Sequence, residues 1–161
     1  MEFKSKTVLI LGGNSDVGKS LAKDFGKLGS NLILTSRKEG QLDSFKSDLE
    51  IRNEINCDVQ LFDVLDFKSH DSFYKNLKIK PDIVITCIGY LDKQENSQID
   101  FQESLRSIQT NFTGLLSILN IISYDFEKRE EGVIVGISSV AGDRGRGSNY
   151  IYGCSKSGFT S

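Results

Sequence analysis

The sequence has no basic excess, few cysteines and no long hydrophobic run. Its 161 residues carry 20 lysines and arginines against 22 aspartates and glutamates, a formal net charge of −2. Because nucleic-acid-binding surfaces normally carry a clear basic excess, this charge argues against nucleic acid as a partner. The cysteines, at positions 57, 87 and 154, show neither metal-ligand spacing nor a disulfide framework. We therefore expect no metal site and reduced thiols.

Membrane-spanning and targeting segments are also lacking. The longest apolar-rich run, LLSILNII at 115–122, is far too short to cross a bilayer. The charged start MEFKSK does not have the form of a signal peptide, so we expect a cytoplasmic protein. No repeat or low-complexity segment divides the chain, which predicts one domain over residues 1–161.

What the sequence does contain is a regular alternation of short apolar runs and helical patterns. Helical periodicity is clear from about 17 to 28, and again over 38–54, 67–78 and 98–128. Between these stretches, runs typical of buried strands lie at 7–11, 31–36, 58–64, 82–89 and 132–138. The alternation predicts an α/β fold: a doubly wound, Rossmann-like parallel sheet with helices on both faces.

A glycine-rich turn, GGNSDVG, follows the first predicted strand and opens into the first predicted helix. Glycines there let the backbone approach a pyrophosphate, and the helix N-terminus offers free N–H groups. The alternative is a tight turn in which a polar side chain merely caps the helix. As a dinucleotide site, the turn would supply Gly12, Asn14, Ser15, Asp16, Val17 and Gly18.

The end of the second predicted strand favours NADP(H) as cofactor, with NAD(H) as the alternative. In doubly wound folds an acid at this point binds the ribose 2′-hydroxyl of NAD(H), whereas a basic residue accommodates a 2′-phosphate. Here the chain reads Ser36-Arg37-Lys38, with no acid in place, and a planar guanidinium suits phosphate. Alternatively, Arg37 and Lys38 are only solvated charges at the start of a surface helix.

The segment after the fifth predicted strand reads SSVAGDRGRGSNYIYGCSK. Together with the glycine turn and the basic end of the second strand, in this order, it resembles the short-chain dehydrogenase/reductase family. The resemblance extends from about residue 6 to the last residue. It implies an enzyme that uses a serine, a tyrosine thirteen residues later, and a lysine four residues after that tyrosine. In this sequence that spacing selects Ser139, Tyr152 and Lys156, because Cys154 stands four residues after the other tyrosine, Tyr150.

The spacing of these residues also makes chemical sense. Residues four apart share one face of a helix, so the Lys156 ammonium can lie beside the Tyr152 phenol and favour its ionised form. That makes the phenol a better general acid and base. Ser139 would hydrogen-bond the substrate oxygen. The resemblance further implies that Tyr152 and Lys156 contact the cofactor, and that Asn111 completes a proton relay.

Other positions match the family one by one. The resemblance implies that Asp63 and Val64 bracket the adenine of the cofactor. It also implies that Gly89 is the glycine that ends the fourth predicted strand. The sequence departs from the family at Asp16, where a glycine is usual, and at 86–88, where Asn-Asn-Ala is usual. Both departures, with the loop that follows Ser138, resemble a family branch associated with lipid-linked sugars or cell-surface polysaccharides, which points to a sugar-like substrate.

These observations predict an NADP(H)-dependent oxidoreductase that interconverts a carbonyl and a hydroxyl group of a small molecule. The alternatives are a non-catalytic dinucleotide-binding sensor and an inert fragment. The helical stretch at 98–128 has a broad apolar surface, and the resemblance implies that it pairs with its copy, which predicts a homodimer or homotetramer for the full-length protein. Because the chain stops inside the helix that carries Lys156, we expect the domain to be truncated at its C-terminus. Alone, it should be aggregation-prone, bind NADPH weakly at best and be inactive.

Overall fold

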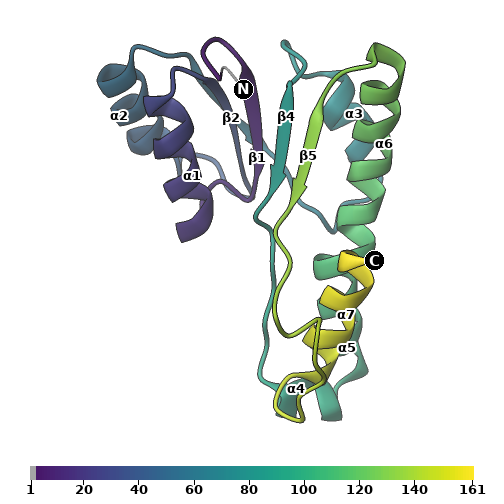
Figure 1. Cartoon of the computed structure of the whole chain (residues 1–161). Helices are drawn as coiled ribbons and strands as arrows, with labels where there is room; N and C mark the ends of the chain where they lie inside the picture. Colours follow the sequence, from purple (N-terminus) through teal and green to yellow (C-terminus); the bar gives the residue numbers. More distant parts are fainter. Residues whose placement is uncertain (1–2) are drawn as a thin grey trace.

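Five apolar runs form one parallel sheet in the computed structural model, which describes residues 3–161 (Figure 1). Residues 1 and 2, where the predicted domain and the charged start begin, lie outside the described residues. The sheet has the order β3-β2-β1-β4-β5, so the chain winds outward from β1 in both directions. The doubly wound α/β prediction is therefore confirmed. The strands are β1 (Thr7–Leu11), β2 (Asn31–Ser36), β3 (Cys57–Leu61), β4 (Ile83–Thr86) and β5 (Val133–Gly136).

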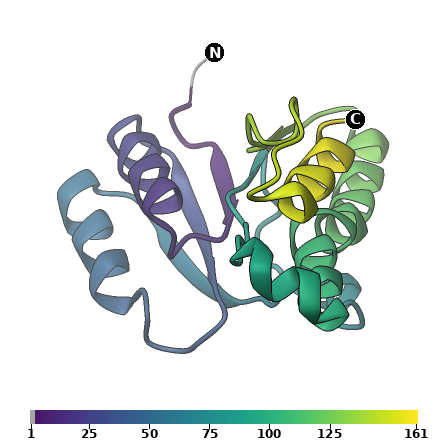
Figure 2. The same cartoon turned by 90° about the horizontal axis from the view of Figure 1, so that it is seen from below.

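Helices cover both faces of this sheet, as Figure 2 shows end-on. Helices α1 (Asp16–Lys27) and α2 (Asp43–Asn53) lie on one face, and α3 (His70–Lys75) and α6 (Gly114–Arg129) on the other (Figure 1). Alternate residues of β1, β2 and β4 supply the two cores, whereas all four residues of β5 are exposed. Val8 of β1 packs in the first core with Leu49, whereas its neighbour Leu9 packs in the second with Ile118.

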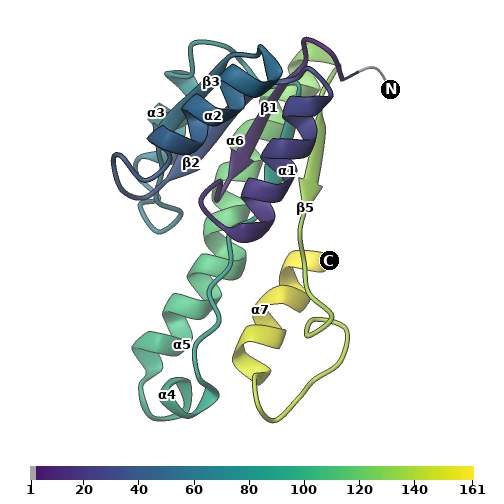
Figure 3. The same ribbon diagram turned by 90° about the vertical axis from the view of Figure 1, so that its left-hand side faces the viewer.

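The remaining helices lie beyond the carboxyl ends of the strands, below the sheet in Figure 3. They are α4 (Gln94–Ile99), α5 (Phe101–Ile108) and α7 (Tyr150–Thr160), and the π-helical turn η1 (Gln109–Thr113) joins α5 to α6. The carboxyl edge is where ligands bind in open α/β sheets. No helix in the described part of the chain is long and apolar enough to cross a membrane.

Several elements are shorter than the sequence pattern predicts. β3 ends at Leu61 rather than 64, because the Asp63 carboxylate accepts the Leu65 N–H and starts a turn. β4 ends before Gly89, and β5 covers only the middle of the predicted run at 132–138. Helix α2 starts five residues later than predicted and α3 is shorter at both ends, whereas α4 was not predicted at all.

Two single-residue predictions are wrong. We expected His70, the only histidine, to be solvated on a surface helix, but it is fully buried against the Phe62 ring. Its Nδ1 lies 3.0 Å from the Ser117 hydroxyl, and burial lowers its pKa. Conversely, Cys154 was expected to pack within its helix and is exposed, because the buried face of α7 is occupied by Ser155 and Lys156.

Candidate active site and nucleotide pocket

The glycine turn between β1 and α1 is held by side-chain hydrogen bonds. The Ser15 hydroxyl accepts the Gly18 N–H at 3.0 Å and donates to the Gly12 carbonyl at 2.8 Å. Thr35, on β2, accepts the Gly12 N–H at 2.9 Å. A Cβ at Gly18 would lie 2.5 Å from the Gly12 carbonyl oxygen, so this close approach requires glycine. Ser15 therefore does cap α1, as the alternative interpretation supposed, while Gly12 and Gly13 leave the backbone at the start of the turn without side chains.

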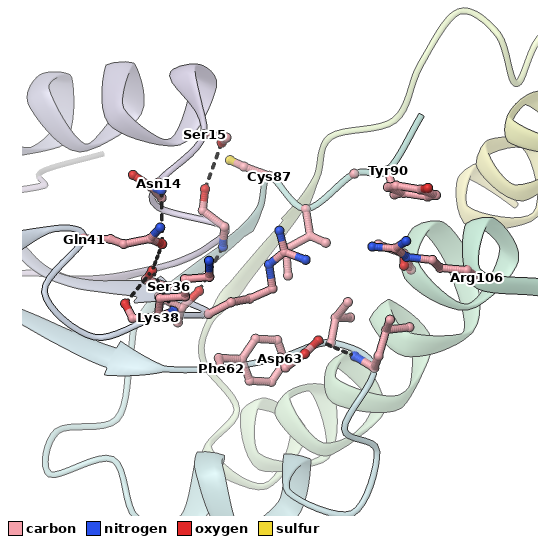
Figure 4. Close-up of a pocket in the computed structure, with 18 residues that line it drawn as sticks. Asn14, Ser15, Ser36, Lys38, Gln41, Phe62, Asp63, Cys87, Tyr90 and Arg106 are labelled. Atoms are coloured by element: carbon pink, nitrogen blue, oxygen red, sulfur yellow. Dashed lines mark hydrogen bonds between the residues drawn. The ribbon is translucent and has the colours of Figure 1, made fainter. Parts of the chain in front are cut away.

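A pocket of about 410 Å³ opens beside this turn (Figure 4). It lies between the ends of β1, β2, β3 and β4 on one side and α5 and η1 on the other. It contains most of the predicted nucleotide contacts: Gly12, Asn14, Ser15, Ser36, Arg37, Asp63, Val64 and Gly89. Asp16, Val17 and Gly18 do not line it. Asp16 is exposed, and Gly18 is buried beneath the turn.

The charges around the pocket favour an anionic ligand. Three basic side chains line it, Arg37, Lys38 and Arg106, against the single acid Asp63. Arg37 is exposed at the pocket rim, directly after β2. Unpaired guanidinium groups bind phosphate strongly because they can donate two parallel hydrogen bonds.

Several lining residues were not identified from the sequence. Gln41 accepts hydrogen bonds from Ser36, at 2.8 Å, and from Asn14, at 3.4 Å, and so ties the loop after β2 to the glycine turn (Figure 4). Arg106, on α5, stacks over the Tyr90 ring with its guanidinium carbon 4.4 Å from the centroid. A pocket-facing loop glutamine has no sequence signature. Arg106 is a single charge on a helix face that only the fold brings to the pocket.

Cys87 also lines the pocket, at a position where the resemblance predicts an asparagine. Burial raises the pKa of its thiol to about 11, so the thiol is protonated at neutral pH. A protonated, half-buried thiol is a weak hydrogen-bond donor and a poor nucleophile. Cys87 therefore serves as a small, mostly apolar part of the wall.

Asn111 lies at the centre of the π-helical turn and is fully buried. Its side chain clamps the backbone of Tyr90: Oδ1 accepts the Tyr90 N–H at 2.9 Å, and Nδ2 donates to the Tyr90 carbonyl at 2.6 Å. Nδ2 also donates to the Ser107 carbonyl at 2.9 Å. The Asn111 amide thus fixes the segment that follows β4, and this segment lines the pocket. π-Helical turns within longer helices occur frequently at functional sites.

Helix α7 carries Tyr152 and Lys156 on successive turns at the carboxyl edge of the sheet. The Lys156 side chain is buried, and its Nζ donates to the Ile137 carbonyl at 3.2 Å. Burial lowers the pKa of this ammonium group. Tyr152 is partly exposed, and Tyr150 more so. Neither Tyr152 nor Lys156 lines the nucleotide pocket itself.

The loop that carries the two serines packs closely on α7. A Cβ at Gly153 would lie 2.6 Å from the Ala141 carbonyl oxygen, so the loop and the helix touch backbone to backbone. Ser139 Oγ accepts the Ala141 N–H at 3.2 Å, and its own proton is left to donate elsewhere. Ser138 instead lies 2.6 Å from the Thr160 hydroxyl, on the last turn of α7. The fold therefore brings the loop that carries Ser139 against α7. The ring of Phe112, on η1, lies close to Gly158 on the same helix.

Among residues 3–161, no group of three histidine, cysteine, aspartate or glutamate side chains is arranged to hold an ion. The same edge of the sheet carries a hydroxyl, a phenol and an ammonium group and a pocket of about 410 Å³ lined by three basic side chains and one acidic one.

Comparison with known proteins gives a consistent result. The family model for short chain dehydrogenase matches residues 6–161. The chain is 28% identical over 154 residues to an uncharacterized oxidoreductase of Mycobacterium tuberculosis, covering 94% of this chain and 61% of that protein. It is 27% identical over 157 residues to the NADP-dependent 3-hydroxy acid dehydrogenase of Schizosaccharomyces pombe, with coverages of 94% and 61%.

Among solved structures, a short-chain dehydrogenase from Sphingobium yanoikuyae in complex with NADPH superposes with a TM-score of 0.86 at 25% sequence identity. The match covers 95% of this chain and 60% of that one. The chain thus spans about 61% of the length of the curated relatives it matches.

Proposed function

The chain belongs to the short-chain dehydrogenase/reductase family, and from this premise we propose that its protein is an NADP(H)-dependent oxidoreductase that interconverts a carbonyl and a hydroxyl group. The observation that carries the proposal is the placement of Ser139, Tyr152 and Lys156. They lie on a loop and a helix that pack backbone to backbone at the carboxyl edge of the sheet. The spacing along the chain and the contact in space are independent features, and both fit one catalytic centre.

The pocket fits a phosphorylated dinucleotide. The turn that begins with Gly12 and Gly13 lies beside the N-terminus of α1, where backbone N–H groups and the helix dipole favour a pyrophosphate. Asp63, Val64 and Gly89 would border the adenine end, and Arg37 would bind the 2′-phosphate of NADP(H). The NADP-dependent relative and the NADPH-bound neighbour are in line with this choice, but an NAD+-bound xylitol dehydrogenase has the same fold, so the choice of NADP(H) over NAD(H) rests on Arg37.

In the proposed reaction the nicotinamide supplies or accepts the hydride, and the residues of this chain handle the proton. Ser139 donates a hydrogen bond to the substrate oxygen and stabilises the charge that develops on it. Tyr152 delivers the proton to that oxygen during reduction and removes it during oxidation. Lys156, one turn along α7, would contact the cofactor. Asn111 would extend the proton path from this site towards solvent.

The substrate we propose is a small molecule of sugar-like chemistry, either free or lipid-linked, in a cytoplasmic enzyme. Its support is the loop after Ser138, in which Arg144 and Arg146 are exposed beside the catalytic helix. Exposed guanidinium groups at this point suit an anionic or polyhydroxylated ligand.

We also propose that the protein forms a homodimer or homotetramer. On α6, Leu116 and Tyr124 remain exposed although they are large and apolar. Such residues on the outer surface of a helix are typical of a subunit interface. Light scattering at micromolar concentration should give at least twice the monomer mass, and a monomer would contradict the proposal.

The cofactor assignment can be tested through Arg37. Replacing Arg37 with aspartate should weaken NADPH binding by about 1.5–3 kcal/mol, or about 10- to 150-fold, because a charge-assisted contact to the 2′-phosphate is lost. NADH binding should change much less. Titrations monitored by nicotinamide fluorescence give both dissociation constants.

The matched control for this charge reversal is Arg52→Asp. Arg52 lies on the outer face of α2, pairs only with Asp48 and does not line the pocket. The Arg52→Asp variant should leave the affinities for NADPH and for NADH unchanged. Equal losses for NADPH and NADH in the Arg37 variant would show that this side chain does not distinguish the two cofactors.

A further inference from the structure

Helix α7, which carries Tyr152 and Lys156, begins without a cap from its own sequence. The first N–H groups of any helix have no partner inside the helix and need one from elsewhere. The residue before α7, Asn149, is of a type that often caps helices, yet its side chain makes no capping hydrogen bond. Its Oδ1 is buried and has no partner within the described residues.

The capping bond comes from a residue far away in the sequence. Gln94, the first residue of α4, accepts the N–H of Ile151 through its Oε1 at 3.2 Å. Ile151 is the second residue of α7, so this acceptor lies where an N-cap side chain would normally place its oxygen. The two residues are separated by 57 positions, and only the fold brings them together.

Burying Gln94 carries a cost that simple packing does not explain. The side chain is only 8% exposed, and its Nε2 has no partner within residues 3–161. A buried amide hydrogen that lacks a partner is destabilising, whereas a leucine would fill similar space without this cost. The interaction that the glutamine gains in return is the bond to α7.

Gln94 is itself held in place from two sides. The chain leaving β4 is clamped at Tyr90 by Asn111, four residues before Gln94. The far end of α4 is fixed to α5, because the Ser104 hydroxyl donates to the Ser97 carbonyl at 2.6 Å in a buried position. A cap anchored in this way can set the position of α7 rather than follow it.

We propose that Gln94 is a positioning residue for the proposed reaction: it caps α7 from a separate element and thereby fixes Tyr152 in the first turn. This inference rests on the proposed role of Tyr152. Gln94 does not touch the reacting atoms. Its loss should let the first turn of α7 fray, which misplaces the phenol but leaves the nucleotide pocket intact, since Gln94 does not line that pocket.

The test compares Gln94→Leu with Gln94→Glu in the intact protein. Leucine fills the space but removes the acceptor, so amide hydrogen exchange should become about tenfold faster at Ile151 and at Gly153, whose N–H donates to the Asn149 carbonyl at 2.9 Å in the first turn. The kcat should fall by a similar factor, while KM for NADPH stays within about twofold of the original value. Glutamate keeps a carbonyl-type oxygen at the same position in either protonation state. It should therefore restore both slow exchange and kcat to within about threefold.

Gln102→Leu is the matched control, because Gln102 is an exposed glutamine on the neighbouring helix α5. It should change neither exchange nor kcat. Unchanged exchange at Ile151 in Gln94→Leu would overturn the proposal. Equal losses in the leucine and glutamate variants would overturn it as well, because they would indicate a packing role. Hydrogen exchange can be measured without a substrate, so the cap and the reaction can be tested separately. If Gln94→Leu showed faster exchange but the original protein and all variants were inactive, the cap would be supported and the proposed reaction refuted.

Discussion

Replacing Tyr152 with phenylalanine should lower kcat about 10²- to 10⁴-fold, the usual contribution of a positioned general acid and base. The substitution removes only the phenolic oxygen, so α7 keeps its packing and the nucleotide pocket is untouched. NADPH affinity should therefore stay within about threefold of its original value. The measurements are steady-state oxidation of NADPH followed at 340 nm and an equilibrium titration with the cofactor.

Tyr150→Phe is the control, since Tyr150 lies two residues away on the same helix and is 43% exposed. It has no lysine four residues later, because Cys154 occupies that position. This variant should retain turnover. If Tyr152→Phe remained active and Tyr150→Phe did not, the assignment of the proton donor would be wrong, although the family would be unaffected.

The second large effect is expected on stability, from Asn111→Leu. Leucine cannot replace the bonds to the Tyr90 N–H and carbonyl, which would then lack partners in a partly buried place. At about 1–3 kcal/mol for each of the two groups left unpaired, the free energy of unfolding should fall by about 2–6 kcal/mol. Urea unfolding at constant pH gives this value directly, provided that the slope m is unchanged.

Asn120→Leu is the control for this substitution, because Asn120 is exposed on α6 and lies outside the clamp. A surface change of this kind usually alters stability by no more than about 0.5 kcal/mol. Should Asn111→Leu prove equally mild, the chain after β4 must be held by other contacts, and the role of Asn111 would be restricted to the proposed proton relay.

Two central strands, β1 and β2, could be predicted from the sequence with their ends, because both are buried and read as short, mostly apolar runs. TVLIL and NLILTS match β1 and β2 residue for residue. The other three strands were predicted too long. In 58–64 the apolar pattern continues through Phe62 and Val64, which are buried but lie beyond the end of β3, Val64 in a turn. Apolar burial alone does not distinguish a residue in a strand from a buried residue in the segment that follows the strand.

Helix α4 and His70 show what the sequence pattern could not provide. QENSQI has no apolar face, and α4 is stabilised by contacts with α5 and α7 instead. His70 begins a short helix surrounded by polar residues, yet the phenylalanine ring of Phe62 and the Ser117 hydroxyl enclose it. Both depend on tertiary partners far away in the sequence.

The nucleotide pocket could be predicted in large part, because its first half follows a local rule: strand, glycine turn, helix. The other half depends on which helix faces the turn across the sheet edge. Arg106 and Gln41 line the pocket only because α5 and the loop after β2 fold over it, so no spacing along the sequence predicts their position. The same holds for Gln94, whose partner on α7 is defined by the fold alone.

The most direct test of the central claim is a hydride-transfer measurement with the intact protein. NADPH absorbance at 340 nm would be followed in stopped-flow experiments against aldehydes, ketones and keto-sugars, with NADH in parallel. The account predicts that NADPH is consumed only when a carbonyl compound is present, with one equivalent of alcohol formed per NADPH and slower consumption of NADH. Tight NADPH binding without consumption by any of these compounds would contradict it, and would instead support a nucleotide-binding protein that senses the cofactor without reacting.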